Sequence, residues 1–339
     1  MKRHFARRGV LLLAVLSMAV ATAAVGAGSF AGATSNKARH NSVKVLKVAL
    51  VAPSATNDLA FTESMYNALE ALAGPDHLKI SVSANEFVVS DAANIIREYA
   101  SKGYNLVIAH GSQYGSTVEQ LAAQFPKVSF AWGTAGSTFG RKNIFAYEAS
   151  SNEGGYVQGY IAGLISKSHK LGVIGPIATG DAKLYVDGFV AGAKAASKKV
   201  VVHPVYTGSF SDDSLMATAA KTFVSGGADV LTGSSQSVVG AIGVAVSDHL
   251  PWFSTQWSQV SLAPHNVVSS QVYNWKPILT QMFTEIRSGV RGGATYVIGL
   301  GNKGESIQFN SGYHLAPSVK AKAMTLIKEI TNGTVVVPQ

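Results

Sequence analysis

One stretch of the chain sets a carboxylate and an aromatic ring close together, at Asp58 and Phe61. The residues before them, 48–51, form an apolar run rich in β-branched side chains, which is typical of a buried parallel strand. A polar turn follows, and apolar side chains then recur at helical spacing from Phe61 onwards. This order places side chains at the carboxyl edge of a parallel sheet, where a small flat polar ligand would bind. In the alternative interpretation, which these residues alone favour, Asp58 only caps the helix and Phe61 only packs on the sheet.

Other residues with catalytic potential fit structural roles better. Residues 299–304 match G-x-G-x-x-G, but the next residues resemble a strand, so a hairpin turn is predicted instead of a dinucleotide site. Asp212 and Asp213 could act as acid and base, although adjacent acids before a helix are usually caps. The nine His residues show no metal-ligand spacing, and the chain has no G-x-S-x-G elbow and no Cys. We therefore expect no catalysis, no metal and no cofactor.

The first residues have the pattern of an export signal. An uncharged apolar run at 10–25 follows four basic residues, Lys2, Arg3, Arg7 and Arg8. Small residues then offer A-x-A cleavage sites, so residues 1–33 are predicted to be a cleaved signal peptide, with a retained membrane anchor as the alternative. The adjacent Arg7 and Arg8 leave both Sec and twin-arginine export open. Because the chain has no Cys, it can carry neither a lipid-modified Cys nor a disulfide.

Composition predicts a large hydrophobic core and no nucleic-acid partner. Four of the positive charges behind the formal net charge of +9 lie in the leader, and further basic residues crowd a predicted flexible tail at 34–43. Beyond the tail the positive charges are scattered, which argues against nucleic-acid binding. Only 14% of residues are charged and 47% are hydrophobic, so a chain of this length is expected to form two α/β lobes.

Strand and helix patterns alternate along most of the chain, which predicts doubly wound parallel sheets. The first series has strands at 48–51, 79–83, 106–109, 128–132 and 143–147. After a helix at 152–167 rich in small residues, a second series has strands at 171–175, 200–206, 229–232 and 251–254, with helices at 181–196, 214–225 and 237–247. Residues 52–58 also resemble 175–181 at a constant offset, Pro53 against Pro176 and Asp58 against Asp181. This self-match suggests two copies of one lobe.

The last third of the chain has too few elements for a third domain. It has predicted strands at 267–272, 296–300 and 307–310, and helices at 277–288 and 318–331. We expect these segments to complete the two lobes and to cross between them as a hinge. The predicted lobes are 44–148 with 256–290, and 149–255 with 291–333, followed by a tail at 334–339. The ligand would lie in the cleft between them.

Five motifs in order resemble the basic membrane protein family, exported solute-binding proteins that include purine nucleoside receptors of ABC transporters. The first is Asn-Asp-Leu-Ala-Phe-Thr-Glu-Ser-Met-Tyr at 57–66, and the second is Asn-Glu-Gly-Gly-Tyr-Val-Gln-Gly-Tyr-Ile-Ala-Gly at 152–163. The others are Gly-Ser-Phe-Ser-Asp at 208–212, Gly-Ala-Asp-Val at 227–230 and Ser-Ser-Gln-Val-Tyr-Asn-Trp at 269–275. The resemblance extends from about residue 47 to 333.

This resemblance implies a type I periplasmic-binding fold, in which two doubly wound parallel-sheet lobes are joined by a three-strand hinge. It implies that Phe61 and Phe210 stack on a base from opposite lobes, and that Asp58 accepts a hydrogen bond from a ribose hydroxyl or a base N–H. Polar groups at strand ends would complete the site. The implied ligand-binding residues are Asp58, Phe61, Thr62, Ser112, Gln113, Phe210, Ser235, Gln236, Gln256, Trp257 and Tyr273.

The chain also departs from the family pattern at the implied site. Thr62 stands where the family often has Asn, and Gln256 and Ser258 align with positions that are commonly Asp. Tyr273 or Trp275 stands where nucleoside receptors carry a Lys. Losing the acids and the Lys removes a charged pair that would hold a purine edge, so the ligand need not be a purine nucleoside.

The resemblance implies an exported monomer that delivers a nucleoside-like solute to an ABC permease in the membrane, from the periplasm or the cell surface. Two alternatives remain open. One is a ligand-sensing extracytoplasmic protein for a membrane receptor. The other is an exported enzyme acting on nucleosides or sugars, in which Asp58 or Asp212 would be the candidate catalytic acid or base.

Overall fold

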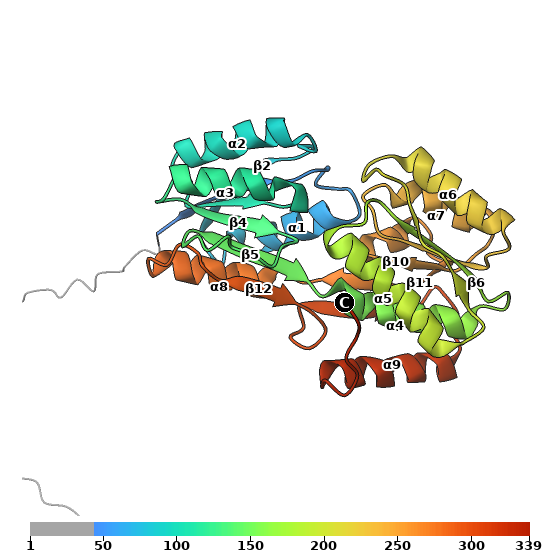
Figure 1. Cartoon of the computed structure of the whole chain (residues 1–339). Helices are drawn as coiled ribbons and strands as arrows, with labels where there is room; N and C mark the ends of the chain where they lie inside the picture. The colour runs from blue at the N-terminus through green and yellow to red at the C-terminus, as the bar shows by residue number, and fades with distance from the viewer. Residues whose placement is uncertain (1–43) are drawn as a thin grey trace, which may run out of the picture. The chain divides into compact units, whose positions relative to one another are not determined.

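The computed structural model describes residues 44–339, and the predicted signal peptide and basic tail lie outside the described residues. The described chain folds into two β-sheets, each placed between two layers of helices (Figure 1). The expected architecture of two doubly wound α/β lobes is therefore confirmed.

The first sheet contains six parallel strands in the order β12-β5-β4-β3-β1-β2. Its strands are β1 (Leu46–Val51), β2 (Leu78–Ser83), β3 (Leu106–Ala109), β4 (Ser129–Gly133), β5 (Ile144–Ala149) and β12 (Thr295–Ile298). Helices α1 (Phe61–Ala73) and α8 (Lys276–Arg287) pack on one face, and α2 (Val89–Ser101) and α3 (Gly115–Gln124) on the other. Because both faces are covered, the central strands consist of nearly continuous apolar residues.

The second sheet orders its strands β13-β11-β10-β9-β6-β7, and only β13 runs antiparallel to its neighbour. Its strands are β6 (Lys170–Gly175), β7 (Val201–Val202), β8 (Val205–Tyr206), β9 (Val230–Gly233), β10 (Trp252–Ser254), β11 (Val267–Tyr273) and β13 (Glu305–Phe309). The single strand predicted at 200–206 is in fact two short strands that both pair with β6. Pro204 interrupts it because proline has no N–H for the ladder.

Helices α4 (Ser151–Ile165), α5 (Gly180–Ala196) and α9 (Pro317–Thr331) cover one face of the second sheet, and α6 (Asp213–Ser225) and α7 (Val238–Ser247) the other. The small residues of α4 are explained by its contact with α5. A Cβ on Gly159 would overlap the carbonyl oxygen of Phe189, and a Cβ on Gly188 would overlap that of Asn152. The two helix backbones can approach this closely only because both positions lack a side chain.

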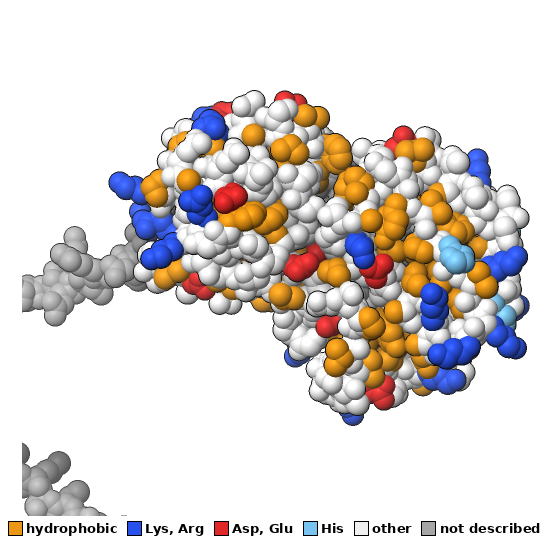
Figure 2. All heavy atoms as spheres, in the orientation of Figure 1, with side chains coloured by type: hydrophobic (Ala, Val, Ile, Leu, Met, Phe, Trp, Pro, Cys, Tyr) orange, Lys and Arg blue, Asp and Glu red, His pale blue; other side chains and the backbone are white. Residues whose placement is uncertain are grey.

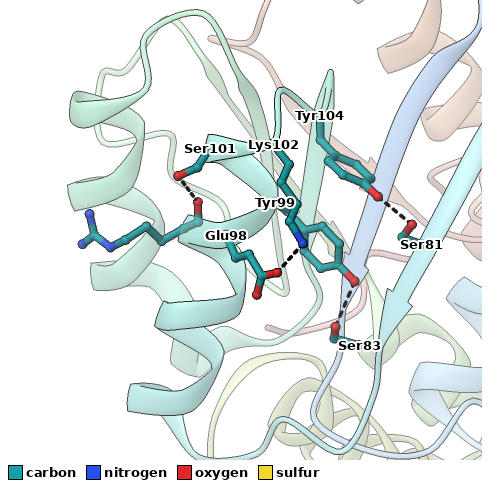
Figure 3. A network of polar contacts seen from close by, with 8 residues as sticks. Ser81, Ser83, Glu98, Tyr99, Ser101, Lys102 and Tyr104 are labelled. Carbon is teal, nitrogen blue, oxygen red and sulfur yellow. Dashed lines mark hydrogen bonds and ion pairs between the residues drawn. The ribbon is translucent and has the colours of Figure 1, made fainter.

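Helix α2 is tied to the edge strand β2 by two tyrosines (Figure 3). The hydroxyl of Tyr99 lies 2.9 Å from Ser83 Oγ, and that of Tyr104, just after the helix, lies 2.7 Å from Ser81 Oγ. The side chains of Ser81 and Ser83 are partly buried, and these bonds give their hydroxyl groups hydrogen-bond partners.

Three segments cross between the two sheets, in agreement with the expected three-strand hinge. They join β5 to α4, β11 to α8, and β12 to β13. The last crossing contains the Gly-rich run 299–304, so the predicted hairpin is wrong. The strands on either side of this run belong to different sheets, β12 pairing with β5 and β13 with β11.

The same pairings correct the predicted lobe boundaries. Residues 256–290 are predicted in the first lobe, but β11 lies in the second sheet. Of this range, α8 and the two aromatic residues before it, Tyr273 and Trp275, pack on the first. Residues 291–333 were assigned to the second lobe, but β12 completes the first sheet. The chain crosses between the two sheets three times, so each lobe contains elements from segments that are distant in the sequence.

On the face shown in Figure 2, most of the described surface is uncharged. Lys and Arg side chains stand there in separate small groups, with Asp and Glu among them. No helix within residues 44–339 combines the length and the apolar character that crossing a bilayer requires.

Candidate ligand-binding site

A pocket lies where the carboxyl ends of strands from both sheets face each other, as expected for ligand sites in open α/β sheets. It contains about 630 Å³ of empty space, part of it continuous with solvent. Loops after β1, β3 and β4 and the start of α1 line it from the first lobe. Loops after β6, β8, β9 and β10, the start of α5 and the end of β11 line it from the second. The lining residues are Pro53, Ala60, Phe61, Gly111, Ser112, Gln113, Thr134, Thr179, Asp181, Ala182, Phe210, Ser234, Ser235, Gln236, Thr255, Gln256 and Tyr273.

The structure brings together eight of the eleven residues that the sequence predicts for the site. Asp58, Thr62 and Trp257 are not among the lining residues. The eight that line the pocket are Phe61, Ser112, Gln113, Phe210, Ser235, Gln236, Gln256 and Tyr273.

Phe61 begins α1 and is held in place by a buried histidine. Its ring stacks on that of His110 with centroids 3.8 Å apart and planes inclined by 4°. His110 Nε2 lies 3.1 Å from the Phe61 carbonyl oxygen, which can only accept, so this nitrogen carries the proton. The other ring nitrogen, Nδ1, then accepts from the Tyr147 hydroxyl at 2.7 Å. One face of Phe61 is thus covered, which leaves the other for the pocket.

Burial keeps this histidine uncharged. Its side chain is fully buried, and the loss of solvation lowers the pKa of His110 to about 3. A neutral imidazole can stack on Phe61 without a counter-ion. Tyr273 and Trp275 meet the same ring edge-on, with centroids 6.5 and 5.9 Å away. Phe61 therefore projects from a fixed aromatic cluster.

Phe210 lines the pocket from the second lobe, on the loop between β8 and α6. Ser235 donates from Oγ to the Phe210 carbonyl oxygen at 2.9 Å, which ties this loop to the end of β9. The ring of Phe87, from the first lobe, lies 6.1 Å from the Phe210 ring. The two rings form an aromatic contact between the lobes.

Two further contacts join the lobes near the pocket. Gly180, at φ +54°, approaches Thr134 so closely that a Cβ would lie 2.7 Å from Thr134 Oγ1. Gln259 Nε2 donates to the Leu59 carbonyl oxygen at 3.0 Å. These contacts connect the two lobes beside the pocket.

Asp58 caps the start of α1 and does not face the pocket. Its carboxylate accepts from Ser54 Oγ at 2.5 Å and from the backbone N–H groups of Ala60, Thr62 and Glu63 at 2.8, 3.1 and 3.0 Å. Thr62 is fully buried, with Oγ1 2.7 Å from Ser54 Oγ. The geometry thus assigns Asp58 the capping role instead of the ligand-accepting role implied by the resemblance, and it places Thr62 in the support of α1.

Trp257 lies in a different groove. This groove runs between α1 and the segment 272–276, and Trp257 is 42% exposed in it. The preceding residue, Gln256, lines both the groove and the pocket. Gln256 and Trp257 are neighbours in the sequence, but only Gln256 lines the pocket.

Asp181 is a pocket residue that the sequence analysis did not assign to the site. It lies in the first turn of α5 and is only 5% exposed. Its Oδ1 accepts a long hydrogen bond from Ala149 N at 3.4 Å, and its Oδ2 has no partner within residues 44–339. Burial raises the pKa of Asp181 well above its usual range, and the carboxylate of Glu148 raises that pKa further. The self-match of Asp58 with Asp181 was the signal that could have identified it.

Two glutamines at the pocket are also incompletely paired. Gln236 Oε1 and Gln256 Nε2 are buried and lack a hydrogen-bond partner in the described part of the chain. Most buried polar atoms in folded proteins are paired. Gln236 and Gln256 therefore join Asp181 as pocket-lining residues that have a polar atom without a partner within residues 44–339.

The lining contains no Lys, Arg or His. Across residues 44–339 there is also no cluster of three His, Cys, Asp or Glu side chains suited to a metal ion. The pocket therefore offers aromatic faces and hydrogen-bonding groups, with Asp181 as its single acid.

The sequence profile described as ABC transporter substrate-binding protein PnrA-like (Bmp) matches residues 45–339. A purine-binding protein of Brucella abortus is 28% identical over 236 residues, which cover 68% of this chain and 66% of that protein. The nucleoside-binding protein BmpA of an ABC transporter of Lactococcus lactis is 29% identical over 228 residues, 65% of this chain and 63% of that protein. The matched segment thus spans slightly less than two thirds of each relative.

Among solved structures, an ABC transporter solute-binding protein from Conexibacter woesei superimposes with a TM-score of 0.71 at 24% identity. The superposition covers 86% of this chain and 98% of that protein. This likeness confirms the type I periplasmic-binding fold.

Proposed function

The chain belongs to the Bmp family of PnrA-like ABC transporter substrate-binding proteins, and on this premise we propose that it encloses a nucleoside or a related flat polar solute between its two lobes. It would act outside the cytoplasm and deliver the solute to an ABC permease. The names of the purine-binding and nucleoside-binding relatives support this ligand class. The family consists of solute-binding proteins, and we propose binding without chemical conversion here as well.

The observation that carries the proposal is the composition of the pocket. Phe61 and Phe210 line it from opposite lobes, and Phe61 stands on an immobile partner, His110. A ring that is already held in place loses little conformational entropy when a base stacks on it, so a fixed ring favours binding. The unpaired atoms of Asp181, Gln236 and Gln256 supply hydrogen bonds for the edge of a polar ring.

The departures from the family pattern bear on which solute binds. Gln256 stands where an Asp is common in the family, and the lining has no basic side chain that could pair with a charged edge. An uncharged nucleoside, held by stacking and by neutral hydrogen bonds, fits this lining. A phosphorylated nucleotide does not fit, because no cation faces the pocket to neutralise its phosphate.

Two measurements test the proposal. Mass spectrometry would identify any small molecule that copurifies, and thermal unfolding with a nucleoside series would rank the solutes. A ligand specific for the folded state stabilises it by about 2.7 kcal/mol at a hundred times its dissociation constant. We expect at least one nucleoside to raise the melting temperature in a concentration-dependent way. No shift with any nucleoside would refute the ligand class, and conversion of a nucleoside to product would refute the non-catalytic role.

A further inference from the structure

Two aspartates that match in the internal repeat have opposite environments. Asp58 receives four hydrogen bonds from its own loop and helix start, so its carboxylate is fully occupied. Asp181 lines the pocket, is 5% exposed, and has only the 3.4 Å contact from Ala149 N on Oδ1. One acid is thus completely paired, whereas the other lines the pocket and has a buried Oδ2 without a partner within residues 44–339.

The groups that face Asp181 include no cation. From its neighbouring strands these are Tyr147 and Glu148 on β5, Tyr273 on β11 and Glu305 on β13. On α5 itself, Lys183 pairs with Asp187 on the exposed surface. An ionised Asp181 would therefore be a buried negative charge beside other acids, which is unfavourable without a bound cation.

Resting on the proposed function, we propose that Asp181 is a specificity-determining residue that meets the ligand as an uncharged carboxylic acid, donating a hydrogen bond from Oδ2 to an acceptor atom of the ring. Oδ1 already accepts from Ala149 N, so the carboxyl proton belongs on Oδ2. A ring nitrogen with a lone pair, or a ring carbonyl oxygen, accepts this bond. A ring N–H at the same place would put two donors against each other, the ring N–H and the Asp181 O–H. A ligand with a donor at this position is therefore rejected.

This assignment links affinity to pH with a definite sign. The acceptor binds only the protonated acid, so affinity is constant at low pH and falls as the pH rises through the pKa of Asp181. Burial has raised that pKa, so the fall comes on the alkaline side of the usual carboxyl range. A ligand that instead binds the ionised carboxylate through a cation or a strong donor would bind more tightly as the pH rises.

The test uses isothermal titration of the full exported chain with adenosine, cytidine, inosine and uridine, between about pH 5 and pH 9. The variants are Asp181→Asn, which keeps a neutral donor in the same place, and Asp181→Ala, which has none. Asp187→Asn serves as the matched control, because Asp187 lies on the same helix but on the exposed surface.

We expect wild-type affinity for the best-bound nucleoside to decline towards high pH, and Asp181→Asn to bind it with similar affinity but without the decline. Asp181→Ala should bind about tenfold more weakly, because the ring acceptor is left unpaired in the closed pocket. Asp187→Asn should behave as wild type. Thermal unfolding of each variant without ligand shows whether it folds.

Two results overturn the assignment. One is an Asp181→Asn variant as weak as Asp181→Ala, and the other is a wild-type affinity that rises with pH. Either result requires measurable binding of a nucleoside, so the proposed function would stand while this inference fails. If none of the four nucleosides binds wild-type protein, the ligand class itself is refuted.

Discussion

Truncating Phe61 to alanine tests the proposed ligand stacking against core packing, because this ring packs on His110 and also lines the pocket. One face stacks on His110, with centroids 3.8 Å apart, and the ring as a whole lines the pocket. Stacking of a base on an aromatic side chain contributes about 1–3 kcal/mol. The variant should therefore bind its nucleoside about 5–150-fold more weakly, since each 1.4 kcal/mol is a factor of about ten.

The cost of Phe61→Ala to stability should be small by comparison. An aromatic pair such as Phe61 and His110 contributes about 0.5–1.5 kcal/mol beyond the area that it buries. The ring is only partly buried, so the loss should stay below the roughly 3–5 kcal/mol of a buried phenylalanine. For a chain of this size we expect the melting temperature to fall by only a few degrees, about 2–4 °C for each kcal/mol.

Phe139→Ala is the matched control. Phe139 belongs to the same lobe and stacks on Trp132 with centroids 4.9 Å apart, but it does not line the pocket. Phe139 packs on one ring and is 38% exposed, whereas Phe61 also meets Tyr273 and Trp275. The melting temperature without ligand should therefore fall no further for Phe139→Ala than for Phe61→Ala. Calorimetric titration should show weaker binding only for Phe61→Ala.

Two outcomes would refute this reasoning. If Phe61→Ala unfolds as readily as a core truncation while the remaining folded protein binds with unchanged affinity, Phe61 is a packing residue. If both variants lose the same affinity, the pocket is not where the ligand stacks.

Gly159→Ala should destabilise the protein by about 1–3 kcal/mol in urea unfolding, because its Cβ overlaps the backbone of α5. Gly243→Ala, in α7 with open space around its Cβ, should instead be neutral or stabilising by up to about 1 kcal/mol; equal losses at both positions would contradict the tight contact of α4 with α5. Glu305→Gln should raise the melting temperature more at pH 8 than at pH 4.5. Burial raises the pKa of Glu305 above its value in the unfolded chain, and the Glu153 carboxylate raises that pKa further. The folded protein therefore loses stability as the pH rises above the pKa of Glu305 in the unfolded chain. An equal gain at both pH values would show that charge is not the cause. Trp257→Ala should leave nucleoside affinity unchanged, since Trp257 lies in the other groove; a loss of affinity would place the ligand there.

Local pattern was enough to predict most of the strands and helices, whereas two of the pocket rings, Phe61 and Phe210, were implied only by the family resemblance. A buried parallel strand shows itself as an apolar run, and an amphipathic helix by its spacing, so the two α/β series could be recognised without coordinates. Phe61 and Phe210 follow strands of opposite lobes, and the carboxyl ends of those strands face one pocket. Eight of the eleven residues that the resemblance implies for the site line this pocket.

Pairing between distant segments could not be predicted. The run 299–304 looks like a hairpin turn because a strand pattern stands on each side of it. Only the partners of those strands, β5 in one sheet and β11 in the other, show that it crosses between the lobes. Strand propensity is a property of a short segment, whereas strand partnership depends on which edge is available after the rest of the chain has folded.

Asp58 and Asp181 show the same division at the site. From the sequence alone they are matching acids near the start of two predicted helices. The local residues favour a capping role for Asp58, and the resemblance implies a ligand-binding role. The structure surrounds Asp58 with donors from its own turn, and it buries Asp181 beside β5 with one long hydrogen bond. Residue type is written in the sequence, but whether a carboxyl group finds donors depends on the backbone geometry around it. For Asp58 the donors come from its own turn, and for Asp181 the single donor is Ala149 N at the end of β5.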